Sequence, residues 1–339
     1  MRVSRDLIMD PVTQGTVGAI LPQGFANRKT LIWATVCGLL GGMAPDLDVL
    51  IRSEDDPLLF LEYHRQFTHS LIFIPIGGSF VGLLLFLLVG QRQGYSLKTT
   101  LIFSNLGYAT HALLDSCTTY GTVLLWPFSD MRFAWNLISI IDPLFTVPIL
   151  MAVFFGILTR QARYSQWGLA WVILYLSLGF FQHRAAIQLG EKIAFSRGHS
   201  PITIDAKPSF ANIIVWKVIY EFEGHYYVDA VRVGLKPTIY EGASIRKLDI
   251  SIDFPWLDQA SVQAADIERF RWFSRGYVAR DPHFPNRVVD IRYSLVPNEI
   301  NSLWSIELSP SNQNDHVSYI TQRGSVDDNW PKLRKMLFD

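Results

Sequence analysis

Six side chains of the kinds that bind metal ions occur in this sequence as three closely spaced pairs. The pairs lie in the motifs APDLD, HRQFTH and HALLD. Carboxylate oxygens and imidazole nitrogens together bind divalent ions, Zn²⁺ above all, with Mn²⁺ and Fe²⁺ as alternatives. The sequence therefore predicts one divalent metal site. The candidate ligands are Asp46, Asp48, His64, His69, His111 and Asp115.

The first two pairs are predicted to lie in loops or at the start of a helix. Asp46 and Asp48 follow Pro45, and side chains two residues apart in extended backbone point to similar sides. Both carboxylates could bind one ion, or one could orient a neighbouring imidazole. His64 and His69 would be splayed by about 140° on one helix, so His64 is expected in a loop and His69 in the first helical turn. An ordinary helix-ending loop and a structural histidine pair are the alternatives for these segments.

The third pair, His111 and Asp115, is four residues apart on a predicted helix, so both side chains lie on one face. They could bind a metal jointly, Asp115 could orient a ligating His111, or the two could form a hydrogen bond within the helix. Arg65 could clamp an anionic substrate such as a phosphate. Whichever of Asp46, Asp48 and Asp115 does not bind metal is the candidate general base.

Long apolar runs separate these pairs and would position them. Stretches without Asp, Glu, Lys or Arg cover 30–45, 66–91, 99–114, 143–159 and 164–183. A helix needs roughly 20 apolar residues to cross a bilayer, and the segment LIFIPIGGSFVGLLLFLLVG has no polar face to offer water. Residues 1–198 are therefore predicted to form a bundle of about five transmembrane helices that carries the metal site.

The lysines and arginines of the short loops predict the orientation of such a bundle. With a cytoplasmic N-terminus and five alternate crossings, eight of them face the cytoplasm: Arg2, Arg5, Arg28, Lys29, Arg92, Lys98, Arg160 and Arg163. Three lie in the outer loops: Arg52, Arg65 and Arg132. All six candidate ligands then also lie outside. The prediction is a multi-pass protein, integral to the cytoplasmic membrane, with an extracytoplasmic C-terminal domain.

The shorter part of the chain, 199–339, has the composition of a soluble domain, since it carries 34 of the 60 charged residues. Strands are predicted at 210–220 and 225–234, separated by the turn-like EFEG, and an amphipathic helix at 260–274. The predicted fold class is thus an α-helical membrane bundle followed by a small α+β domain with an antiparallel sheet.

Composition and missing motifs exclude several classes of function. The formal net charge is zero, which does not favour a nucleic-acid partner. The chain has no GxSxG elbow, P-loop or dinucleotide fingerprint. Its two cysteines form neither a CxxC pair nor a disulfide framework.

The chain resembles the YdjM-type family of bacterial inner-membrane proteins, which are described as membrane-bound metal-dependent hydrolases. The resemblance covers roughly residues 9–150, in the motifs MDPVTQGTVG, GGMAPDLDVL, HRQFTHSL, HALLDSCTTYGTVLLWPFSD and SIIDP. It implies that the six candidate ligands form the metal site. Gln14 stands where the family usually has His, so one metal position is lost, altered or filled by water. More distantly, the family resembles zinc-dependent phospholipases C and nucleases, which hydrolyse phosphoesters.

Two functions fit these features. The first is a membrane-embedded metal-dependent hydrolase at the outer membrane face, acting on an amphiphilic substrate such as a phospholipid or prenyl phosphate. The second, which Gln14 favours slightly, is a non-catalytic, metal-stabilised membrane scaffold whose outer domain binds a partner. A transporter is a third hypothesis, but transport sites usually lie near the bilayer midplane between repeats, and the sequence shows no internal repeat.

Overall fold

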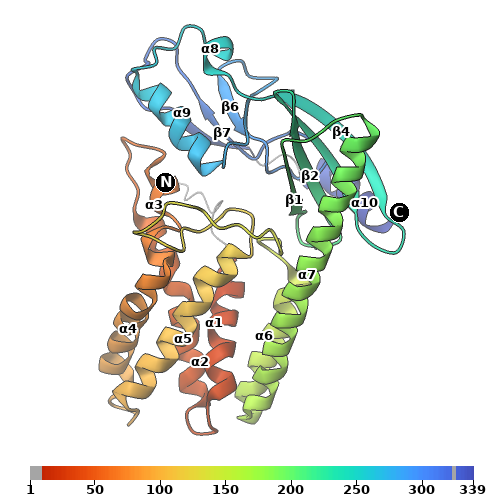
Figure 1. The fold of residues 1–339 in the computed structure, drawn as a ribbon. Coiled ribbons are helices and arrows are strands. Elements are labelled where there is room, and N and C mark those ends of the chain that lie inside the picture. The colour runs from red at the N-terminus through yellow and green to blue at the C-terminus, as the bar shows by residue number, and fades with distance from the viewer. Residues whose placement is uncertain (1–9, 323–325) are drawn as a thin grey trace. The chain divides into compact units, whose positions relative to one another are not determined.

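The computed structural model of the chain describes residues 10–322 and 326–339. It divides into two compact units, whose elements are labelled in Figure 1. The first unit comprises the residues up to Leu50, then Tyr63–Phe180 and Phe210–Asn212; the second comprises Ile51–Glu62, Phe181–Ser209 and Ile213–Asp339. The segment Ile51–Glu62 therefore interrupts the first unit in sequence and belongs to the second by its contacts.

The first unit is helical. Its long helices are α1 (Pro11–Phe25), α2 (Leu31–Met43), α4 (Ile74–Leu85), α5 (Leu97–Ser116), α6 (Pro143–Thr159) and the N-terminal half of α7 (Ala162–Ser196). Short helices lie between them: η1 (Ala44–Leu50), η2 (Phe67–His69), η3 (Leu71–Phe73) and the π-helical η4 (Phe86–Gly90). The short helix α3 (Leu59–Tyr63) belongs to the second unit except for Tyr63. The motifs APDLD and HRQFTH thus lie in short connecting segments, and HALLD ends α5.

Glycines let three helices of this unit approach until their backbones touch. A Cβ atom at Gly38 on α2 would meet the carbonyl oxygen of Gly18 on α1, and one at Gly107 on α5 would meet the carbonyl oxygen of Gly38. A larger side chain at either position would therefore push helices apart. This close packing fixes the C-terminal end of α2 beside α5, where the candidate ligands lie.

The prediction of about five transmembrane helices is wrong. Among the described residues, one helical segment, Leu71–Gly90, is long and apolar enough to cross a membrane, with a mean hydropathy of 2.5. α2 is only 13 residues long, because the chain turns into η1 at Ala44. α6 is apolar but has 17 residues, and polar side chains interrupt α5 and α7. A stretch without charges is therefore not equivalent to a continuous apolar helix.

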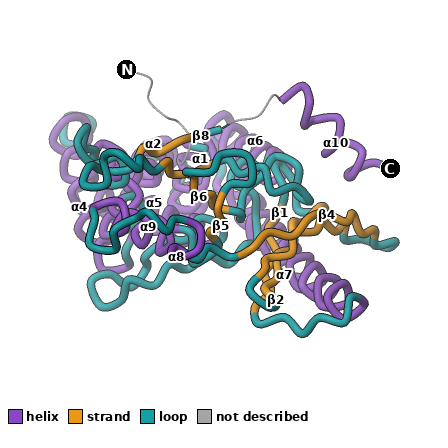
Figure 2. Tube along the Cα trace, turned by 90° about the horizontal axis from the view of Figure 1, so that it is seen from above, coloured by secondary structure: helices purple, strands orange, loops and turns teal. Residues whose placement is uncertain are grey.

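The second unit has two four-stranded antiparallel sheets, whereas the sequence predicted a single one. The first has the order β1 (Thr203–Pro208), β2 (Val215–Phe222), β3 (His225–Arg232), β4 (Thr238–Arg246). The second has the order β5 (Val278–Arg280), β6 (Arg287–Asp290), β7 (Trp304–Glu307), β8 (Ser318–Thr321). Figure 2 shows them as separate groups of strands. The sheet breaks after β4 because the chain then forms α8 (Ile250–Asp253) and α9 (Val262–Phe273), the second of which confirms the predicted amphipathic helix.

Helices complete the second unit. The C-terminal half of α7 packs on the first sheet, since a Cβ at Gly190 would meet the side chains of Val218 and Ile204. The helix α10 (Val326–Phe338) ends the chain, and its Met336 packs in the core cluster with Val215.

An arginine on α9 holds the segment Ile51–Glu62 within the second unit. The guanidinium group of Arg269 donates to both carboxylate oxygens of Asp56, at 3.0 and 2.7 Å, and to Glu62 Oε1 at 2.5 Å. It also donates to Asp266 on its own helix at 2.8 Å. One cation thus serves three carboxylates, two of which come from this segment.

Candidate metal centre

Four side chains of the first unit converge on one point: Asp46 from η1, His69 from η2, and His111 and Asp115 from α5. We call these four the metal cluster. Nε2 of His69 lies 3.5 Å from Asp46 Oδ1 and 3.3 Å from Asp115 Oδ2. Nε2 of His111 lies 3.3 Å and 3.7 Å from the same two oxygens. A tetrahedral ion with bonds of about 2.0–2.1 Å keeps its ligand atoms about 3.3 Å apart, so these separations fit such an ion.

The converging atoms are buried, and none of the four makes a hydrogen bond to the described part of the chain, although Asp115 Oδ2 forms an ion pair with Nε of Arg65 at 3.0 Å. The side chains of His69, His111 and Asp115 are fully buried, and that of Asp46 is 13% exposed. Leaving one buried polar atom unsatisfied costs about 1–3 kcal/mol, so four at one point indicate that a ligand belongs between them. Two imidazole nitrogens and two carboxylate oxygens form a donor set suited to a divalent cation.

Each histidine of the metal cluster has its other ring nitrogen engaged. Nδ1 of His111 lies 2.5 Å from the carbonyl oxygen of Gly42, to which it donates. Nδ1 of His69 lies 3.1 Å from Asp48 Oδ2 and 2.9 Å from the Thr68 hydroxyl oxygen. The proton on a ring nitrogen is fixed by the hydrogen bond that this nitrogen makes. Both rings therefore carry a proton on Nδ1, and in the neutral form each would present the lone pair of Nε2 to the cluster, as metal ligands do.

Asp48 lies beside the cluster and supports it. Its Oδ1 lies 2.7 Å from Nδ1 of His64, and its Oδ2 accepts from the Thr68 hydroxyl at 2.6 Å and from the backbone N–H of Arg65 at 3.1 Å. Burial raises the pKa of Asp48, but the neighbouring His69 and His64 outweigh it and hold that pKa well below its usual range. Asp48 and His64 could form a second cation site with Asp46, yet their facing atoms already bond each other.

Gln14 and Arg65 contact the carboxylate of Asp115. Nε2 of Gln14 donates to Asp115 Oδ1 at 2.8 Å, and Nε of Arg65 lies 3.0 Å from Oδ2. Gln14 thus contacts the oxygen of Asp115 that faces away from the cluster. The guanidinium group of Arg65 is buried; its Nη1 donates to the Thr118 hydroxyl at 3.0 Å, and it lies over the ring of Tyr120.

The loop after α5 holds the HRQFTH segment in place. The backbone N–H of Val123 donates to the carbonyl of Arg65 at 2.9 Å, and that of Leu71 donates to the carbonyl of Leu124 at 2.9 Å. Arg65 itself has a φ angle of 64°, in the left-handed region, and such a conformation must be stabilised by the surrounding structure. These backbone bonds fix the turn that carries His69.

The structure brings all the sequence-predicted site residues together, in different positions. Asp46, His69, His111 and Asp115 meet in the metal cluster, whereas Asp48, His64 and Arg65 lie beside it. The sequence predicted Thr68 only as a helix N-cap, whereas its hydroxyl bonds Asp48 and His69; Thr118 and the carbonyl of Gly42 were not predicted. Thr68 stands between the two histidines of HRQFTH, and Thr118 lies three residues after Asp115, so nearness to a ligand was the available signal for both.

The helical part of the chain is similar to known proteins. Residues 9–186 match the family model described as YdjM inner membrane protein. The inner membrane protein YbcI of Escherichia coli (strain K12) is 37% identical over 134 residues, which cover 38% of this chain and 75% of that protein. No solved structure matches the chain. The family match includes the whole metal cluster, and the chain belongs to the YdjM family of inner membrane proteins.

Proposed function

We propose that this inner membrane protein is a metal-dependent hydrolase whose divalent ion is bound by Asp46, His69, His111 and Asp115. The observation that carries the proposal is the convergence of four buried donor atoms without hydrogen-bond partners among the described residues. Zn²⁺ is the proposed ion, because two imidazoles and two carboxylates at tetrahedral spacing suit it; Mn²⁺ and Fe²⁺ are the alternatives. Residues 1–198 would carry this site, and 199–339 would form the attached α+β domain.

A divalent ion at this position would lower the pKa of a bound water towards about 7 and polarise the scissile bond. Asp46 is the cluster residue that solvent reaches, so water and substrate would approach from its side. Asp46 faces the cluster through Oδ1, so its other carboxylate oxygen would accept the proton of the attacking water as general base. Asp48 is a weaker candidate for this role, because its oxygens already accept from Thr68 and the backbone of Arg65.

The surroundings of Asp46 support an amphiphilic phosphoester as substrate. Leu47 and Leu50 on the same short helix are 64% and 76% exposed, which suits an acyl or prenyl chain. Arg65 lies against Asp115, and its guanidinium group would balance the negative charge of a phosphate. A membrane phospholipid or a prenyl phosphate is therefore the proposed substrate class.

We propose that the metal cluster faces the outer side of the inner membrane. The short loops at the opposite end of the first unit (Figure 1) carry Arg28, Lys29, Arg92 and Arg160, and an excess of such residues favours the cytoplasm. Helix α1 begins at the cluster's end, since Gln14 reaches Asp115. The described N-terminal end would then lie outside too, unlike the cytoplasmic N-terminus that the loop charges alone suggested.

Elemental analysis tests the proposal directly. The full-length protein, purified without chelator, is expected to contain one divalent ion, and His111→Ala is expected to contain none. His283→Ala is the matched control, because His283 is an exposed histidine of the second unit. Metal-loaded protein is then assayed on phosphatidylcholine vesicles and on a prenyl phosphate. Intact wild-type protein that never contains metal would defeat the proposal.

A non-catalytic, metal-stabilised scaffold is the second candidate. It is favoured because four protein side chains would fill all the positions of a tetrahedral ion. Structural zinc sites have four protein ligands, whereas catalytic sites keep a position open. Turnover by the metal-loaded wild type separates the two candidates. A hydrolase would cleave phosphatidylcholine or the prenyl phosphate and lose this activity together with its metal in Asp46→Asn, whereas a scaffold would show no turnover in the wild type and a lower melting temperature in the variant.

A further inference from the structure

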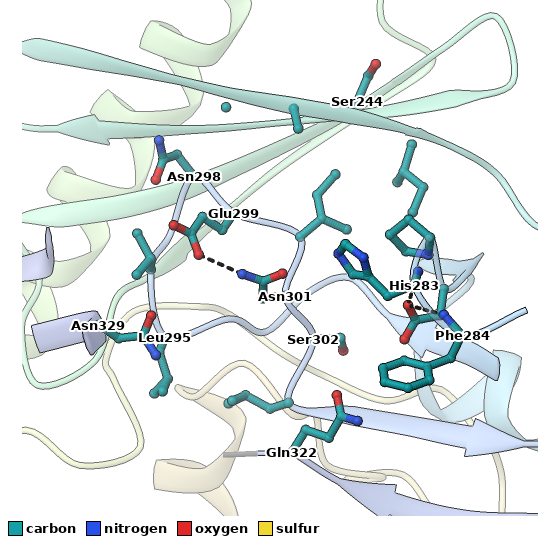
Figure 3. Close-up of a pocket in the computed structure, with 18 residues that line it drawn as sticks. Ser244, His283, Phe284, Leu295, Asn298, Glu299, Asn301, Ser302, Gln322 and Asn329 are labelled. Carbon is teal, nitrogen blue, oxygen red and sulfur yellow. Dashed lines mark hydrogen bonds between the residues drawn. The ribbon is translucent and has the colours of Figure 1, made fainter. Parts of the chain in front are cut away.

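A cavity of about 700 Å³ lies in the second unit, and none of the described residues that line it is a proposed metal ligand. Four segments line it: 242–245 of the edge strand β4, the loop 281–284 after β5, the loop 295–303 before β7, and two residues near the C-terminus, Gln322 and Asn329. Its size is in the range of pockets that bind small molecules. Figure 3 shows the side chains of His283, Asn298, Asn301 and Gln322 around the same space.

The charges of this cavity do not suit an ionic ligand. Among the described residues that line it, none is Lys or Arg. Its two carboxylates already have donors: Asp281 accepts from the backbone N–H groups of His283 and Phe284, at 2.8 and 3.2 Å. Glu299 accepts from Asn301 Nδ2 at 2.8 Å and pairs with Lys332 at 2.7 Å. An anion would find no cation there, and a cation would have to displace these bonds.

Uncharged hydrogen-bonding groups and one aromatic ring are what the cavity offers. Asn298 donates through Nδ2 to the carbonyl of Glu241 at 2.8 Å, while its Oδ1 is buried with no hydrogen-bond partner in the described residues. Such an acceptor requires a donor from a ligand or water. The ring of Phe284 is 42% exposed, and the guanidinium of Arg287 stacks 3.9 Å from its centroid, which fixes the ring in orientation.

We propose that this cavity binds an uncharged carbohydrate. Sugar hydroxyls both donate and accept, which matches carboxamides, and the apolar face of a sugar ring packs on an aromatic side chain. Asn298 and Asn301 would bond hydroxyl groups, and Phe284 would pack against a ring face. This site is independent of the proposed hydrolase function and of the metal.

Titration calorimetry on the full-length protein tests this proposal. The protein is kept in an amine-oxide detergent, because a maltoside headgroup would itself compete. Maltotetraose, cellotetraose and chitotetraose are titrated separately, and at least one is expected to bind with a dissociation constant between about 10 µM and 1 mM. Asn301→Ala and Gln322→Ala are each expected to weaken binding about fivefold, the loss of one hydrogen bond. The exposed loop variant Gln93→Ala is the matched control and should bind as the wild type does.

Several outcomes would overturn the proposal. One is no heat from any of the three saccharides up to about 10 mM. Another is preference for tetragalacturonate, which would show an anion site. Binding of an uncharged acetylated tetrapeptide in place of the sugars would assign the cavity to extended peptides. Saccharide binding that neither cavity variant weakens would place the sugar elsewhere on the molecule.

Discussion

Both units bury charged side chains, but they satisfy them differently. In the second unit, Arg292 donates through Nε and Nη2 to both oxygens of Asp290, with both side chains fully buried. In the first unit, the metal cluster sets two imidazole lone pairs against two carboxylate oxygens. A donor facing an acceptor is complete, whereas acceptors that face one another repel until a cation lies between them. Arg65 pairs with Asp115 Oδ2, which leaves the carboxylate of Asp46 and the two imidazoles for a second cation. The kind of atom that faces inward therefore distinguishes a structural ion pair from a metal centre.

The largest expected effect on metal affinity comes from removing a cluster carboxylate without changing its size. In Asp115→Asn, the side chain presents either an uncharged amide oxygen or an amide N–H group to the cluster. Metal affinity should therefore fall by at least about 100-fold. Competition with a fluorescent chelator measures it. Lys98→Gln, an exposed change on the same helix outside the cluster, should leave the affinity unchanged. Wild-type metal affinity in Asp115→Asn would mean that the first unit has no metal centre to contrast with the ion pair of the second.

The second prediction breaks the complete pair of the other unit. Asp290→Asn leaves the guanidinium of Arg292 buried beside a neutral amide, and breaking such a pair costs about 3–5 kcal/mol. Urea unfolding should show this loss of stability, while elemental analysis should find the same metal content as in the wild type. A fall in metal content would mean that the two units do not respond separately.

A smaller effect is expected from the residue that orients a proposed ligand. Asp48→Asn keeps an acceptor near Nδ1 of His69 but removes the negative charge, so metal affinity should fall about 10–100-fold. Asp55→Asn, an exposed change in the neighbouring segment, serves as control. An effect as large as that of Asp115→Asn would place Asp48 among the ligands themselves.

The smallest effect concerns pH and the buried Lys217 of the second unit. Burial lowers the pKa of Lys217 from 10.5 to about 7, although its ammonium reaches Ser294 and the carbonyl of Glu299 at 2.9 and 2.8 Å. Between these pKa values the unfolded chain binds a proton that the folded chain does not. The free energy of unfolding should therefore rise by roughly 1 kcal/mol per pH unit above pH 7.

Urea titrations at about pH 7, 8 and 9 measure this slope. The contribution of Lys217 is fully present above the unfolded pKa and is lost as the pH falls through the folded one. Lys217→Met should flatten the dependence, because its side chain has similar length and no charge. An equal slope in the variant would assign the pH dependence to another group.

The sequence could predict that the candidate ligands lie close together, but not which of them face the cluster and which lie beside it. Each pair is local, and the helix spacing of His111 and Asp115 is a property of the sequence alone. The separation of Asp46 from Asp48 depends on the short helix η1, which turns the second carboxylate towards His64. The contact between Gln14 and Asp115 joins residues 101 positions apart, and one sequence carries no signal for such a pair.

Helix lengths were the poorest prediction. Runs free of charged residues suggested five crossings, yet helix ends are set by backbone geometry and by polar residues that carry no charge. The run at 30–45 passes from α2 into η1 at Ala44. The run at 66–91 begins with two short turns, η2 and η3, before the long helix starts. The strand pattern continues in VDIRYSLV and SLWSIELS, which overlap β6 and β7, but strands of three or four residues do not show that they form a second sheet.

The ion pairs between Arg269 and the segment Ile51–Glu62 matter for any truncation of this protein. A protein that ends after residue 198 would lack Arg269, so Asp56 and Glu62 would lose the cation that they share. That acidic stretch connects Asp48 to His64 in the chain. A shortened protein that loses metal would then report a disturbed tether between the ligand motifs, and Asp56→Asn with Glu62→Gln in the same shortened protein should restore much of the loss.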